Sequence, residues 1–349
     1  MSLKLGWEPL DLHTKHAFHI ARASAPPVRR NVWVRLTDGD GCEGWGEAAP
    51  SPYFGENVET VVASLPKFAA ALADVDDPAR VEVEQGLIHG IPDSSARAAL
   101  STALHDLFAK RMGAPLWRLW GLTPSSPRSS FTIGIDEPSI MRERVAAAAS
   151  YPILKIKLGT DRDEEILRLV RDAAPDARIR VDANTGWTTK RALRHLDVLA
   201  ELDIELIEQP LHPLDLDGLR LLRERSTLPI IADESCRTSA DIPRLYGCVD
   251  GINIKLAKCG SLREALHMVH AARDLGMLVM LGCMIESTLG IAAAIQLASL
   301  CDFVDLDGAA LLADDPFTGP GLEPDGTLRF NEDPGLGVTT TFHHRDRGH

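Results

Sequence analysis

Residues 153–182 read ILKIKLGTDRDEEILRLVRDAAPDARIRVD and contain the pattern that decides the fold. They begin with an apolar run, continue through an amphipathic stretch that starts near Asp163, and end with a second apolar run at 178–182. A strand, a helix and a second strand in this order form the repeating unit of parallel α/β proteins.

The unit repeats along the chain. Apolar, β-branched runs start at intervals of roughly 22–26 residues, and amphipathic helical patterns fill most of the gaps. Eight such strands close into a (β/α) barrel. The alternative is an open, doubly wound sheet, which the absence of a Gly-rich nucleotide loop after an early strand disfavours. The runs are 131–135, 153–157, 178–182, 204–208, 229–233, 251–255, 277–281 and 303–307.

The two ends of the chain differ from this repeat. The first third predicts strands followed by helices, with a strong turn at Asp38–Gly41. The last part is polar and rich in Pro and Gly. We therefore expect an N-terminal α+β module at residues 1–125, the barrel at 126–310, and a segment at 311–349 that returns to the N-terminal module.

The composition excludes several functions. The chain has 349 residues and a net charge of −13, which argues against a nucleic-acid partner. No run approaches the roughly 18 apolar residues of a membrane span, and the first residues lack the core of a signal peptide. The six cysteines are scattered without a CxxC pair, so we expect a reduced, cytoplasmic protein with no membrane partner.

Ionisable side chains gather where the expected strands end, which is where barrel enzymes place their chemistry. Burying such groups is costly unless they are paired or bind a metal, so this edge predicts a functional site. The polar residues at these positions are Lys155, Lys157, Asp182, Asn184, Glu208, Asp233, Glu234, Lys255, Glu286, Asp305 and Asp307.

Three carboxylates follow on successive strands, at Asp182, Glu208 and Asp233. An all-oxygen ligand set suits a hard divalent ion, and Mg²⁺ is favoured over zinc. The alternative is that each carboxylate pairs with a neighbouring lysine.

Two lysines, Lys157 and Lys255, lie on the second and sixth expected strands, roughly opposite each other across the ring. A nearby metal or cation such as Lys155 depresses the pKa of a lysine, which can then act as a base. Two bases on opposite faces of one carbon predict racemisation or epimerisation. The alternative is that both lysines only form salt bridges.

These residues resemble the motifs of the enolase superfamily, in its muconate-lactonizing subgroup. The matching features are Lys155-x-Lys157, the three carboxylates, Lys255 within residues 253–260, and Gly44–Ala48 in the N-terminal hairpin. The resemblance implies a capping domain on a modified (β/α)7β TIM-like barrel, one Mg²⁺ per subunit, and an enediolate intermediate.

Within the subgroup, Asp305 and Asp307 resemble the paired aspartates with which dipeptide epimerases bind the substrate's free ammonium group. Residues 283–287 also resemble the seventh-strand segment of these enzymes and place Glu286 at the substrate. The resemblance further implies that Lys155 touches the substrate carboxylate.

Three further roles follow from the resemblance. Asn184 and Glu234 would orient the metal ligands and Lys255. The L-Ala-D/L-Glu epimerases hold the glutamate side chain with a basic residue of the first capping loop, and Arg22 lies in this loop. The alternative for Arg22 is a solvated loop charge.

The expected function is therefore that of a Mg²⁺-dependent dipeptide epimerase, which inverts the α-carbon next to the C-terminal carboxylate by proton transfer between two bases. The alternative in the same subgroup is an N-acylamino acid racemase or a muconate-type cycloisomerase. A barrel that binds a chelated carboxylate without turnover is a further alternative, although binding alone needs no opposed lysines. We expect a small-molecule dipeptide substrate and a homo-oligomer.

Overall fold

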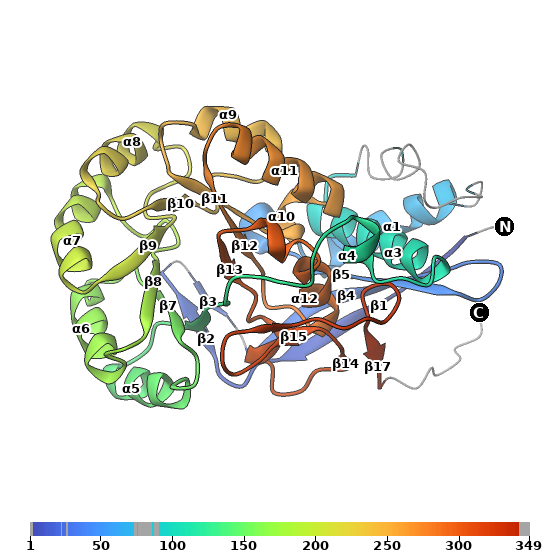
Figure 1. Cartoon of the computed structure of the whole chain (residues 1–349), viewed down its shortest axis with the longest axis horizontal. Helices are drawn as coiled ribbons and strands as arrows, with labels where there is room; N and C mark the ends of the chain where they lie inside the picture. Colours follow the sequence, from blue (N-terminus) through green and yellow to red (C-terminus); the bar gives the residue numbers. More distant parts are fainter. Residues whose placement is uncertain are drawn as a thin grey trace.

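An eight-stranded parallel sheet forms the centre of the computed structural model, which describes residues 3–21, 23–25, 27–72, 75, 86 and 91–341 (Figure 1). Each strand pairs with its neighbours in sequence. The strands are β6 (Phe131–Ile133), β7 (Ile153–Lys157), β8 (Arg178–Asp182), β9 (Ile204–Glu208), β10 (Ile230–Ala232), β11 (Gly251–Ile254), β12 (Leu278–Gly282) and β13 (Phe303–Asp305).

The sheet closes on itself. Ser129, just before β6, forms a parallel bridge with Val304 on β13. After β13 the described chain has only the short turn η4 (Ala309–Leu311) before the C-terminal segment, so the (β/α)7β barrel is confirmed and the open sheet is wrong. The helices between the strands are α5 (Pro138–Ala147), α6 (Asp163–Ala173), α7 (Thr189–Glu201), α8 (Leu216–Arg225), η2 (Ser239–Asp241), α9 (Ile242–Leu245), α10 (Leu256–Cys259), α11 (Leu262–Asp274), α12 (Thr288–Ile295) and η3 (Ala298–Leu300).

The register of the parallel strands brings the polar strand ends together. Lys157 on β7 pairs with Asp182 on β8, and Asp182 pairs in turn with Glu208 on β9. Apolar side chains of the same strands, such as Ile156 and Val181, are fully buried in the main hydrophobic core. The core therefore fixes the strands while their carboxyl ends present charged groups at one level.

The N-terminal module packs against one side of the barrel (Figure 1). Gly44 and Gly46 explain its tight packing, because a Cβ at either position would collide with a backbone carbonyl oxygen of α3. Its elements are the antiparallel strands β1 (Lys4–His13), β4 (Val28–Thr37) and β5 (Glu43–Ala48), the hairpin β2 (Phe18–Ile20) and β3 (Ala23–Ala25), the turn η1 (Pro52–Phe54), and the helices α1 (Val58–Leu72), α3 (Ser94–Arg111) and α4 (Leu116–Leu119).

Glu47 on β5 connects this module to the barrel. Its buried carboxylate accepts hydrogen bonds from Asn31 on β4 and from the backbone N–H groups of Ser287 and Gly290 at the start of α12. The Ser287 hydroxyl donates to the same carboxylate. Glu47 thereby satisfies donors at a helix N-terminus that would otherwise be buried without a partner.

The C-terminal segment packs on the N-terminal module. Leu312 forms a bridge with Thr14, and the N–H of Leu336 donates to Asp106 on α3. Within the described residues, no helix is long and apolar enough to cross a membrane. The segment contains the short strands β14 (Phe317–Thr318), β15 (Gly321–Leu322), β16 (Leu328–Arg329) and β17 (Thr339–Thr340).

Candidate active site

Three carboxylates converge at the mouth of the barrel. Asp182 ends β8, Glu208 ends β9, and Asp233 directly follows β10. One oxygen atom from each lies within 4.8 Å of the others, and all three residues are buried. Oxygen donors at this spacing fit a hard divalent cation such as Mg²⁺.

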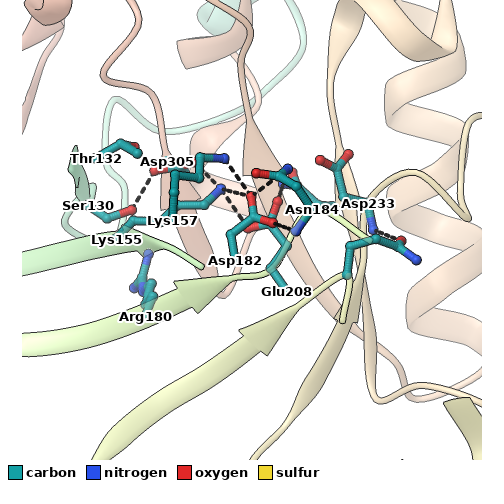
Figure 2. Close-up of polar contacts among 12 residues, drawn as sticks. Ser130, Thr132, Lys155, Lys157, Arg180, Asp182, Asn184, Glu208, Asp233 and Asp305 are labelled. Atoms are coloured by element: carbon teal, nitrogen blue, oxygen red, sulfur yellow. Dashed lines mark hydrogen bonds and ion pairs between the residues drawn. The ribbon is translucent and has the colours of Figure 1, made fainter. Parts of the chain in front are cut away.

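Two lysines of β7 point toward this cluster, as Figure 2 shows. Lys155 Nζ lies 2.6 Å from Glu208 Oε2 and 3.3 Å from Asp182 Oδ2. Lys157 Nζ lies 2.6 Å from the same Asp182 oxygen. The salt bridges weighed as the alternative to a metal site are thus present, but they leave Asp182 Oδ1 and Glu208 Oε1 to other donors.

Asp182 Oδ1 and Glu208 Oε1 accept hydrogen bonds from neighbouring N–H groups. The backbone N–H of Asn184 donates to Asp182 Oδ1 over 2.8 Å, and Asn253 Nδ2 donates to Glu208 Oε1 over 2.9 Å. Asn184 adopts a left-handed backbone with φ of 44°, which asparagine tolerates better than most residues. Its side chain also lies 3.5 Å from Glu234 Oε1, so Asn184 connects Asp182 with the loop after β10.

Burial and neighbouring charges oppose one another at these carboxyl groups. Burial raises the pKa of Glu208 to about 7, and the charge of Asp182 acts in the same direction. Burial also acts to raise the pKa of Asp182, but Lys157 and Lys155 outweigh it and hold that pKa below its ordinary value. The pKa values of these two carboxyl groups therefore shift in opposite directions, although a lysine lies 2.6 Å from each.

Lys255 follows β11, the strand that pairs with β10, and contacts the cluster at Asp233. Its Nζ lies 2.8 Å from Asp233 Oδ2. Burial lowers the pKa of Lys255, and Lys155 lowers it further as the sequence predicts, but Asp233 and the other carboxylates outweigh both and raise this pKa. The depressed pKa expected for this lysine is therefore absent while carboxylates are its nearest charges.

Asp305 and Asp307 lie at the end of β13 with different partners. Asp305 Oδ2 lies 2.8 Å from Lys155 Nζ, and the Ser130 hydroxyl donates to Asp305 Oδ1 over 2.6 Å. Asp307 Oδ2 accepts the backbone N–H of Thr132 over 2.6 Å, and Cys283 Sγ lies 4.0 Å from Asp307 Oδ1. Burial, together with Asp305, raises the pKa of Asp307 to about 6.

A cavity of about 350 Å³ opens at these groups and is lined by residues of both the barrel and the N-terminal module. Lys157, Lys255, Asp305 and Asp307 line its floor, together with Lys155, Asn184, Asp233, Glu234 and Lys258. The opposite wall is largely apolar and comes from the N-terminal module and the loops after β12 and β13. It contains Phe18, Ile20, Pro50, Pro52, Tyr53, Phe54, Met284, Ile285 and Leu311.

One of the described residues expected at the substrate is not brought to this cavity. Glu286 lies outside its lining, where its carboxylate accepts the Met284 N–H over 3.0 Å and packs against Gly290 of α12. Burial and the nearby Glu47 raise the pKa of Glu286 to about 8. Arg22 lies outside the described residues.

Three residues in or beside the site were not predicted. Arg29 lines the cavity, and no carboxylate in the described part of the chain pairs with it. Gln209 accepts the backbone N–H of Asp233 over 2.9 Å and so ties β9 to β10. Lys258 contacts Asp233 Oδ1. Lys258 reaches the site through a one-turn helix that the strand pattern does not predict, and Arg29 lies outside the repeating strands of the barrel.

Comparisons with known proteins agree with this geometry. A family model described as mandelate racemase / muconate lactonizing enzyme, N-terminal domain, matches residues 10–121, and one described as enolase C-terminal domain-like matches residues 140–343. The L-Ala-D/L-Glu epimerase of Bacteroides thetaiotaomicron is 39% identical over 344 residues, which cover 96% of this chain and 88% of the relative. The hydrophobic dipeptide epimerase of Roseobacter litoralis is 41% identical over 320 residues, covering 88% and 90%.

A solved structure shares the whole fold. The dipeptide epimerase from Enterococcus faecalis, complexed with Mg and the dipeptide L-Leu-L-Tyr, superposes with a TM-score of 0.91 at 32% identity. The match covers 97% of this chain and 100% of that one. The chain therefore belongs to the mandelate racemase and muconate lactonizing enzyme family of the enolase superfamily, as an isomerase of the branch that contains the dipeptide epimerases.

Proposed function

We propose that the chain is a Mg²⁺-dependent dipeptide epimerase that inverts the α-carbon next to the C-terminal carboxylate of its substrate. The observation that carries this proposal is the pair Lys157 and Lys255. Both lysines line the same cavity. Lys157 contacts Asp182, whereas Lys255 contacts Asp233. A site that only bound a carboxylate would need neither lysine in that position.

The three carboxylates Asp182, Glu208 and Asp233 would hold the metal ion. Bound there, Mg²⁺ supplies positive charge that stabilises the charge developing on the substrate carboxylate and lowers the pKa of nearby lysines. The relatives named as dipeptide epimerases, including one complexed with Mg, support this assignment.

Lys157 and Lys255 would transfer protons from and to the α-carbon of the substrate. One neutral amine takes the proton from the α-carbon, and the ammonium group of the other lysine returns a proton to the opposite face. Lys155 is ion-paired with three carboxylates at once, whereas the ion pairs of Lys157 and Lys255 involve one carboxylate each. We therefore assign Lys155 to charge balance and orientation, and the proton transfer to the other two lysines.

Asp305 and Asp307 would bind the free ammonium group of the dipeptide. Both line the cavity, and adjacent carboxylates make a strong receptor for an ammonium group. Asp307 is the better placed of the two, since Asp305 already pairs with Lys155. An N-acylated substrate or a cycloisomerase substrate lacks this charge, so the pair favours a free dipeptide.

The test is incubation of the purified chain with Mg²⁺ and a library of L,L-dipeptides in D₂O, followed by mass spectrometry and chiral analysis. A dipeptide that gains one deuterium at the α-carbon of its C-terminal residue and yields the L,D epimer supports the proposal. If no dipeptide in the library exchanges this proton, the proposed activity is wrong. N-acetylated dipeptides in the same assay test the alternative racemase activity.

A further inference from the structure

Lys258 is a buried cation that belongs to none of the roles assigned above. Its side chain is 1% exposed. Its Nζ lies 2.5 Å from Asp233 Oδ1 and 2.6 Å from the Asp233 carbonyl oxygen, and it also donates to the carbonyl oxygens of Cys236 and Asn253. An ammonium group has three donors, so these four acceptors use its full capacity.

The local backbone explains how Lys258 reaches Asp233. The helix α10 is a single turn that starts directly after Lys255, and it ends at Gly260 in the left-handed conformation with φ of 86°. The Gly260 N–H donates to Leu256 and closes the turn. This turn brings Lys258, three residues after Lys255, back to the loop that follows β10.

Asp233 is consequently shared between two lysines of one segment. Lys258 contacts Oδ1, whereas Lys255 contacts Oδ2 at 2.8 Å. The backbone N–H of Asp233 is fixed independently by Gln209. Because the backbone of Asp233 and its Oδ1 atom are both held, the carboxylate group cannot rotate freely. The direction in which Oδ2 can contact a ligand is therefore fixed.

We propose that Lys258 is a positioning residue, which holds Asp233 Oδ1 so that Oδ2 faces the cation-binding cluster. This inference rests on the proposed function only in assuming that Asp182, Glu208 and Asp233 bind Mg²⁺. Groups that orient metal ligands typically contribute about 10- to 100-fold to metal affinity.

The test compares Mg²⁺ binding by the wild-type chain and by the Lys258→Met variant, without substrate, through titration calorimetry and the Mg²⁺-induced rise in Tm. We expect the Kd for Mg²⁺ to increase about 10- to 100-fold. Removing a positive charge beside a cation site would by itself tighten binding, so an unchanged or lower Kd would overturn the proposal.

A matched control separates positioning from loss of stability. Lys110→Met removes another lysine that pairs with a buried aspartate, since Lys110 Nζ lies 2.7 Å from Asp106 Oδ2 far from the cluster. We expect this variant to lower the Tm without Mg²⁺ but to keep the wild-type Kd. If both variants weaken Mg²⁺ binding equally, Lys258 has only a structural role.

A double-mutant cycle tests whether Lys258 acts through Asp233. In an Asp233→Asn background, the further change Lys258→Met should alter the Kd for Mg²⁺ less than about threefold, because the group that Lys258 holds has lost its charge. If the two substitutions weakened Mg²⁺ binding independently, so that their fold-changes in Kd multiplied, the inference would be contradicted. A wild-type chain that binds no Mg²⁺ would instead refute the proposed function itself.

Discussion

Lys157 and Lys255 reach one carboxylate cluster from β7 and β11, strands with three others between them in the sheet. Lys157 contacts Asp182, and Lys255 contacts Asp233, so the cluster lies between the two amines. A substrate bound at the cluster would present one face of its α-carbon to each lysine.

Replacing either lysine is therefore expected to abolish epimerisation. Lys157→Ala and Lys255→Ala should each lower kcat/KM at least about a hundredfold, because each removes one partner of the proton transfer. The measurement is circular dichroism or chiral chromatography of a dipeptide that the library screen identifies. The exposed Lys190→Ala is the control, and a single-lysine variant with near wild-type epimerisation would contradict the two-base arrangement.

Asp307→Asn is expected to impair binding of a free dipeptide more than binding of its N-acetylated form. The change keeps the shape of the side chain but removes the charge that would face the substrate ammonium group. We expect KM for the free dipeptide to rise about tenfold or more, since hydrogen bonds to charged groups contribute about 1.5–3 kcal/mol. Steady-state kinetics give the change in KM for the free and for the N-acetylated dipeptide. An equal change in both KM values would show that Asp307 does not bind the ammonium group.

Glu286 is expected to make the stability of the chain depend on pH. Its folded pKa is about 8, whereas an unfolded glutamate titrates near about 4.3. Between these two pKa values the native state holds a proton that the unfolded state releases. Glu286 therefore lowers the free energy of unfolding as the pH rises from the unfolded pKa to the folded pKa, and it has no such effect at lower pH.

The Glu286→Gln variant should remove this dependence. Urea unfolding at about pH 5 and about pH 8 gives the free energies of unfolding, and the variant should gain stability relative to the wild-type chain at the higher pH. Glu143→Gln, at an exposed position of α5, serves as the control. A difference between Glu286→Gln and wild type that stays constant with pH would contradict the raised pKa.

Gly46→Ala is expected to destabilise the N-terminal module. The new Cβ would collide with the carbonyl oxygen of Ala99 on α3, so the strand and the helix would have to separate. Overpacking of this kind typically costs about 1–3 kcal/mol. Gly6→Ala on β1 is the control, because its nearest neighbours would lie 3.9 Å away. Equal Tm values for the two variants would show that β5 can move without cost.

Much of the barrel could be predicted from sequence because most strands are short and largely apolar, and most end in a polar residue or precede one. Lys157, Asp182 and Glu208 end their strands, and parallel pairing in register places such residues side by side. The site roles given to them remain predictions, but their convergence follows from the strand pattern alone.

Other features depend on contacts that strand periodicity does not encode. Lys258 reaches Asp233 only because a one-turn helix reverses the chain before Gly260. The resemblance to dipeptide epimerases implies that Glu286 lies at the substrate, yet its side chain lies against Gly290 of α12 and close to Glu47. Both outcomes are decided by loop conformation, which depends on packing against distant segments.

The Glu47 carboxylate sets a limit on how this chain can be divided. It lies on a strand of the N-terminal module but completes the first turn of α12 in the barrel. A barrel expressed without residues 1–125 would expose the donors of Ser287 and Gly290, and a module transplanted from another protein would have to bring its own acid to the same point. Engineered exchange of the N-terminal module is therefore constrained at this single side chain, whose partner Asn31 also lines the cavity.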